Sequence, residues 1–170
     1  MTAESGTGRA PMTDQTASAE VIKPKVTIVI GREEPTVGTH AYNTLRINNK
    51  VTYLSSNAPK TPKQVYYDAM TILKHLHKNQ GRLVKHSEIL QLFKDTNNEK
   101  SDSYYDYYNS RIDFARTRLI NRLKVGNKTI IKTQQSKHGV ELGIMDYDVE
   151  LDIVEPTVEE GSTVFKAGNN

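Results

Sequence analysis

The sequence of 170 residues contains no cysteine and no tryptophan. The lack of cysteine excludes disulfide bonds and thiolate metal sites, and it is compatible with a reducing compartment. Long apolar runs are also missing. The longest apolar stretch is Val26–Ile30, and even this stretch contains the polar residue Thr27. Residues 1–19 lack the apolar segment of a signal peptide. We therefore expect a cytoplasmic protein that does not span a membrane.

Sequence motifs of common enzyme classes are absent as well. The chain has no glycine-rich phosphate loop, no Gly-x-Ser-x-Gly and no His-Glu-x-x-His. His75 and His77 stand two positions apart in an expected helix, so their side chains would lie on different faces and could not share a metal. We expect a protein that is not an enzyme and that uses no cofactor or metal.

Charge is distributed unevenly along the chain. Residues 1–60 carry seven Lys/Arg and five Asp/Glu, residues 61–140 carry fifteen and seven, and residues 141–170 carry one and eight. The three segments therefore have net charges of +2, +8 and −7. A basic centre favours a polyanionic partner, although an ordinary solvated surface accounts for the same count.

Composition divides the chain into three parts. Residues 1–24 are rich in Thr, Ser, Ala and Gly and are expected to form a disordered arm, whereas residues 25–145 have the patterns of one domain. Residues 146–170 form an acidic tail, in which Tyr147–Ile153 alternates apolar and acidic residues as a strand does before a disordered end. This strand could extend a sheet, pair with a partner, or cover the basic centre as an autoinhibitor.

The first half of the domain begins with strand signals. Val26–Ile30 is β-branched, and Leu45–Ile47 and Val51–Leu54 flank Asn48–Lys50, where asparagine suits a tight turn. The first helix is expected to start at Thr61–Gln64, where Thr61 would be the N-cap and Gln64 would complete a capping box. Apolar residues then recur at helical spacing.

The second half predicts two more helices and a hairpin. One helix runs from His86 or Ser87 to Asp95, and another covers 110–124. Strands at Thr129–Thr133 and Val140–Ile144 surround a polar loop. The fold class is α+β: a winged helix-turn-helix with a small N-terminal antiparallel sheet, three helices and a C-terminal β-hairpin wing.

Three stretches resemble the effector domain of OmpR/PhoB-type transcriptional regulators. Asn79–Val84 followed by Ser87–Leu90 is similar to the family's Asn-x-Gly-Arg-apolar-Val step into a Glu-Leu-Leu helix. Ile112–Leu119 is similar to its recognition helix, and Ile131–Thr133 with Gly139–Leu142 is similar to its wing. The resemblance covers about residues 42–142. It implies sequence-specific binding of double-stranded DNA by a transcription regulator, with paired half-sites and a homodimer as a further expectation.

The chain also departs from that family. No receiver domain is expected upstream, because about forty loosely patterned residues are too few for a doubly wound fold. We expect a standalone, divergent relative of the kind that a phage or mobile element carries. Arg116 occupies a position that is usually an apolar core residue in the family. This departure favours the alternative function, a protein-docking module with little DNA binding.

Candidate DNA-binding residues come from the third helix, the wing and one turn. On a helical wheel, Arg118 and Arg122 fall within about 20° of Arg111, and we expect all three opposite the apolar face. Recognition helix 110–124 would enter the major groove, and wing 128–144 would reach the minor groove or backbone. The candidates are Arg82, Lys85, Arg111, Phe114, Thr117, Arg118, Asn121, Arg122, Lys132, Lys137 and His138.

Four tyrosines stand before the third helix: Tyr104, Tyr105, Tyr107 and Tyr108. In the resembled family this loop is where RNA polymerase can be contacted, and tyrosine is favoured at interfaces. The tyrosines could instead pack onto the domain and begin the helix early, or they could stack on single-stranded bases.

Overall fold

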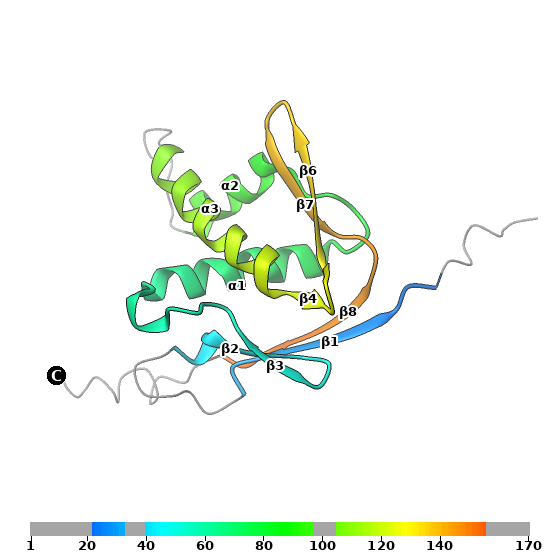
Figure 1. The fold of residues 1–170 in the computed structure, drawn as a ribbon. Coiled ribbons are helices and arrows are strands. Elements are labelled where there is room, and N and C mark those ends of the chain that lie inside the picture. The colour runs from blue at the N-terminus through cyan, green and yellow to red at the C-terminus, as the bar shows by residue number, and fades with distance from the viewer. Residues whose placement is uncertain (1–21, 33–39, 97–104, 156–170) are drawn as a thin grey trace, which may run out of the picture.

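The structure is a computed structural model that describes residues 22–32, 40–96 and 105–155. Most of the expected arm, the end of the acidic tail and Tyr104 lie outside the described residues. The elements are a sheet at the N-terminal side, three helices, and β-hairpins after the helices (Figure 1). This arrangement confirms the predicted α+β fold class and is consistent with a winged helix like that of the OmpR effector domain.

Three strands of the sheet come from the N-terminal half of the chain. β1 (Lys25–Ile30) pairs antiparallel with β2 (Thr44–Ile47), which follows the short 3-10 helix η2 (Ala41–Asn43). β2 pairs antiparallel with β3 (Lys50–Tyr53). Asn48 has a φ of 56° in the turn between them, a left-handed conformation that asparagine tolerates better than most residues. The predicted strands and turn are therefore confirmed.

A fourth strand makes this sheet mixed rather than purely antiparallel. β8 (Asp148–Ile153) pairs parallel with β1, and the strand order is β3-β2-β1-β8. The apolar residues of the acidic segment turn toward the core, and Val149 is buried. The acidic residues lie on the other face, where Lys25 approaches Glu150 at 3.5 Å and Arg32 approaches Asp152 at 3.1 Å.

Of the three roles considered for the acidic strand, the structure shows sheet extension. The Gln80 side chain at the end of the first helix donates to the Val149 carbonyl at 3.0 Å and accepts from its amide at 2.9 Å. The acids of this strand pair with Lys25 of β1 and with Arg32 just after β1, and they do not cover the third helix. For residues 146–155, the autoinhibition hypothesis is therefore wrong.

The first helix, α1 (Lys63–Lys78), follows the 3-10 helix η3 (Ala58–Lys60). Its predicted capping box is absent, because Pro62 is the N-cap and no side chain caps the helix. The Thr61 hydroxyl instead donates to the Asn57 carbonyl at 2.8 Å, and Gln64 donates to Asp68 at 2.9 Å. The hydroxyl of Thr61, which was expected to cap the helix, is therefore hydrogen-bonded within the preceding turn instead.

The second helix, α2 (His86–Thr96), matches its prediction, whereas the third, α3 (Tyr105–Arg122), begins five residues early. The early start has a packing cause, because Tyr108 is 4% exposed and joins the core. Tyr105, Tyr107 and Tyr108 therefore lie in the first turns of the helix, and Tyr108 packs onto the domain, whereas Tyr107 is exposed. α3 also ends before Lys124, since Lys124 enters a strand.

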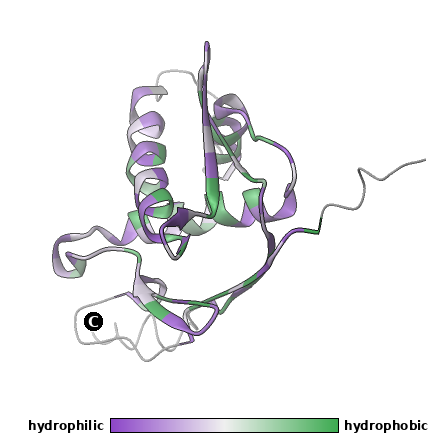
Figure 2. Cartoon of the chain, turned by 45° about the vertical axis from the view of Figure 1, so that its right-hand side comes forward, coloured by the Kyte–Doolittle hydropathy of each residue, from purple (hydrophilic) through white to green (hydrophobic). Residues whose placement is uncertain are grey.

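Two hairpins follow α3. β4 (Lys124–Val125) pairs with β5 (Lys128–Thr129), and β6 (Ile131–Ser136) pairs with β7 (Gly139–Ile144). We call the β6–β7 hairpin the wing. It extends away from the sheet beside α2 and α3, and its strands are hydrophobic at the base and hydrophilic at the tip (Figures 1 and 2).

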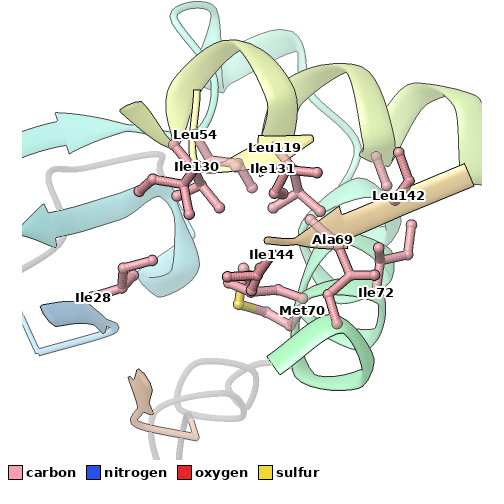
Figure 3. Close-up of a cluster of buried hydrophobic side chains, with 14 of the residues drawn as sticks. Ile28, Leu54, Ala69, Met70, Ile72, Leu119, Ile130, Ile131, Leu142 and Ile144 are labelled. Atoms are coloured by element: carbon pink, nitrogen blue, oxygen red, sulfur yellow. The ribbon is translucent and has the colours of Figure 1, made fainter. Parts of the chain in front are cut away.

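One hydrophobic core joins the sheet, the helices and the base of the wing (Figure 3). Ile28 comes from the sheet, Ala69 and Ile72 from α1, Leu119 from α3, and Leu142 from the wing, all with no more than 1% exposure. This core fixes how α3 is presented to solvent. No described helix is long and apolar enough to cross a membrane.

Candidate nucleic-acid interface

Helix α3 has a buried side and an outer side. Ile112, Ala115 and Leu119 are fully buried, and α3 packs on α1 through this side. At 100° per residue, Phe114, Thr117 and Asn121 cluster about 180° away from this buried stripe, and all three are exposed. We call these three residues the outer side of α3.

The predicted arginine face is not the outer side. Arg111, Arg118 and Arg122 lie about 55–95° from the centre of the buried stripe, so they flank it and are only partly exposed. The expectation that they stand opposite the core is wrong, because the helical spacing places them beside the apolar residues. The three arginines consequently have different environments.

Arg111 forms a buried ion pair with Asp68 of α1. Arg111 Nη2 donates to Asp68 Oδ1 at 2.7 Å and its Nε donates to Oδ2 at 3.0 Å. The two side chains are 14% and 5% exposed. The guanidinium also lies 5.3–5.5 Å from the ring centroids of Phe93, Tyr107 and Tyr108. Arg111 therefore joins α3 to α1, and its guanidinium does not face solvent.

Asp68 is the functional partner that sequence reasoning missed. A signal for it existed, because Asp68 stands within the apolar face of α1 between Val65 and Ile72. A carboxylate in such a position is costly to bury unless a cation pairs with it. The sequence did not show which of the basic residues would do so.

Arg118 and Arg122 remain available at the edge of the outer side. Arg118 Nη1 donates to the Phe114 carbonyl at 3.3 Å, whereas its Nε is buried without a hydrogen-bond partner in the described part of the chain. Among the described residues, no acid forms an ion pair with either arginine. Arg116 differs, because it pairs with Asp113 and is 17% exposed. This pairing explains how an arginine is tolerated near the core stripe.

The segment from α3 to the wing tip is uniformly basic. Residues 114–140 contain seven Lys/Arg and no Asp/Glu. They include the C-terminal half of α3, the β4–β5 hairpin and most of the wing. Apart from Arg116, none of these cations is in an ion pair with a residue that the structure describes. We call residues 114–140 the basic segment.

The wing contributes its candidates in two different places. Lys137 and His138 form the turn at the tip, and both are exposed. Lys132 lies on the hairpin face opposite the buried Ile131, because side chains alternate along a strand. It shares a hollow with Lys128 and so lies apart from the tip residues.

A cleft of about 830 Å³ lies between the wing tip and the helices. Lys85 and His86 line it at the start of α2 and Lys137 lines it from the wing, together with the acidic residues Asp106 of α3 and Glu141 of β7. The wing approaches α2 closely, since a Cβ at Gly139 would lie 3.0 Å from the His86 Cβ. Gly139 also has a φ of 122°, which other residues rarely adopt.

The two candidates at the turn between α1 and α2 also differ. Arg82 donates to both carboxylate oxygens of Glu88, at 2.7 and 3.1 Å, and His75 lies 2.7 Å from the same carboxylate. These hydrogen bonds, that of Arg82 foremost, lower the pKa of Glu88 to about 2. Arg82 therefore holds the turn together. Lys85 is exposed and has no ion pair with a described residue.

The tyrosines do not form a single surface. Tyr108 is in the core, and Tyr107 is 53% exposed on α3. Tyr105 is the first residue of α3. Among the described residues, no group of three or more His, Asp or Glu side chains could hold a metal ion.

Comparisons with protein-family models, with curated proteins and with solved structures find no match to this chain. What the structure shows is the arrangement alone: a mixed N-terminal sheet, three helices and C-terminal hairpins.

Proposed function

We propose that this protein binds double-stranded DNA in a sequence-specific manner and acts as a transcription regulator. The observation that carries the proposal is the basic segment, which combines an exposed helix side with a hairpin and has no acidic residue. An α-helix fits the major groove of B-DNA, and a basic hairpin beside it can follow the backbone or minor groove.

The residues of the interface divide into two roles. Thr117 and Asn121 on the outer side would contact base edges. Cations on the flanks and at the cleft would contact phosphates: Arg118, Arg122, Lys85 and Lys137. Each phosphate that a cation neutralises contributes about −0.9 to the slope of log affinity against log salt concentration. Four such contacts predict a slope of roughly −4.

Arg111 and Arg82 were expected to contact DNA, but this proposal does not include them among the DNA-contacting residues. Each already has a carboxylate partner, Asp68 and Glu88 respectively. Breaking either pair to reach a phosphate would exchange one ion pair for another and, for Arg111, would leave a buried charge unpaired. Their role is to hold α3 and α2 in place on α1.

The test is selection from a pool of random duplex DNA at two salt concentrations, followed by sequencing of the retained molecules. We expect a shared motif and an affinity that falls steeply as salt rises. A repeated half-site would support the expected homodimer. Retention without a motif would contradict sequence-specific binding, and no retention at low salt would contradict DNA binding.

Matched lysine variants locate the interface. Lys137→Ala at the wing tip should reduce affinity and the salt slope, whereas Lys50→Ala in β3 should change neither. Both lysines are exposed, so neither change should disturb folding. Equal effects of the two substitutions would mean that binding follows net charge rather than this surface.

A second candidate function is docking to a protein such as RNA polymerase. The observation that favours it lies on α3 between residues 106 and 114, where Tyr107 and Phe114 are 53% and 56% exposed and Asp106 and Asp113 are exposed as well. Exposed aromatic residues are enriched at protein interfaces. Substitution of Tyr107 by Ala separates the two candidates, because docking should weaken while binding of isolated DNA stays unchanged.

A further inference from the structure

We infer that the outer side of α3 reads A·T base pairs, and in particular the methyl group of thymine. This inference rests on the proposed DNA binding and names the class of sequence that the surface would select. It follows from which side chains face outward and from which ones are already engaged within the protein.

The outer side carries one aromatic residue, one threonine and one asparagine. Phe114 is 56% exposed, and Thr117 and Asn121 are exposed beside it, within about 60° on the helical wheel. Phenylalanine and the threonine methyl offer only apolar contact, which in the major groove is matched by the C5 methyl of thymine. The asparagine amide can pair with N6 and N7 of adenine.

The side chains that normally read guanine are held elsewhere. Arginine is the commonest reader of guanine O6 and N7. Arg111 is bound to Asp68 and Arg116 to Asp113. Arg118 and Arg122 lie about 65° and about 105° from the centre of the outer side, on its flank, where the walls of a groove and their phosphates would stand. An exposed phenylalanine pressed against a G·C pair would instead leave polar groups of that pair without partners.

The test uses altered bases in a duplex recovered by the selection described above. Replacing thymine by deoxyuridine removes only the C5 methyl, and replacing adenine by 7-deazaadenine removes only N7, so the backbone charge stays constant. We expect one thymine position at which the uridine duplex binds roughly ten-fold more weakly, within the range of a base contact. Phe114→Ala should abolish this difference between the thymine and uridine duplexes.

Two controls make the result specific. Asn121→Ala should abolish the effect of 7-deazaadenine while keeping that of uridine, and Lys137→Ala should keep both effects while reducing the salt slope. Thermal unfolding checks that Phe114→Ala is folded, as its exposure predicts. A selected motif of G·C pairs, or uridine duplexes bound as tightly as thymine duplexes, would overturn the inference and leave DNA binding intact. Failure to bind any duplex would overturn the proposed function and this inference together.

Discussion

The flank of helix α3 that carries Arg111, which we call the inner flank, and the outer side of α3 use polar residues for opposite purposes. On the inner flank, Arg111 is 14% exposed and bound to Asp68, so its charge is used within the fold. On the outer side, Thr117 and Asn121 are exposed, and neither shows a side-chain hydrogen bond to a described residue. Two arginines seven positions apart, Arg111 and Arg118, therefore have different roles, because only Arg111 meets a carboxylate on α1.

The comparison shows that charge counts alone do not locate an interface. Of fifteen basic residues in 61–140, those with carboxylate partners in the fold include Arg82, Arg111 and Arg116. The basic segment matters because it contains no acid and because most of its cations form no ion pair with a described residue, so they remain available for phosphate.

The largest effect is expected on stability, when the ion pair between Arg111 and Asp68 is removed. Arg111→Ala leaves the Asp68 carboxylate buried and unpaired, and this should lower the free energy of unfolding by about 3–5 kcal/mol. Urea denaturation measures the loss. Arg122→Ala, which removes an arginine without a described carboxylate partner, is the matched control and should cost less than about 0.5 kcal/mol. A similar small loss for Arg111→Ala would contradict its structural role.

Removal of a base-reading group on the outer side should cost less and affect a different property. Asn121→Ala is expected to weaken binding to the selected duplex by about 1–3 kcal/mol and to relax the preference at one base pair, because a specific contact is lost. Fluorescence anisotropy with matched and mismatched duplexes measures both. Uniform weakening across sequences would instead identify Asn121 as a phosphate contact.

At the wing tip the expected effect is smaller still. Lys137→Ala should change the slope of log affinity against log salt concentration by about 0.9, because one phosphate contact is lost. The measurement is a series of binding isotherms between low and physiological salt. An unchanged slope would show that the tip does not contact the backbone.

The smallest effect concerns the more exposed ion pair at the turn between α1 and α2. The pKa of Glu88 is about 2 in the fold, below the ordinary value of 4.5, chiefly because Arg82 donates hydrogen bonds to its carboxylate. The stabilisation is therefore present above pH 4.5 and is lost as pH falls from 4.5 through 2.

The Glu88→Gln variant tests this pH dependence. It should be less stable than the original protein at pH 6, and the difference in urea midpoint should shrink as the pH is lowered toward 2. A difference that stays constant over this range would contradict the assigned role of the carboxylate.

Local features were predictable from the sequence, and contacts between distant residues were not. The β-branched residues of β1 and the Asn48 turn depend on neighbours in the chain, and so they were found. The parallel pairing of β1 with β8 joins residues more than 120 positions apart, as in Lys25 and Asp148. No local pattern could distinguish that pairing from the other roles of an acidic strand.

In the candidate site too, local features were predictable from the sequence and contacts between elements were not. The exposure of Phe114 and Asn121 follows from helical periodicity, and the wing tip follows from its turn residues. The pairing of Arg111 depends on how α3 crosses α1, which the sequence does not show. The early start of α3 depends likewise on the burial of Tyr108.

The most direct test of the central claim is an NMR titration of the isotopically labelled protein with a selected duplex. The account predicts that the resonances of Thr117, Asn121 and Lys137 shift strongly, while the Nε–H signal of Arg111 keeps its frequency because Asp68 still holds it. Shifts confined to the N-terminal sheet, or a large shift of the Arg111 signal with none at Asn121, would contradict the claim that the outer side of α3 and the wing tip bind DNA.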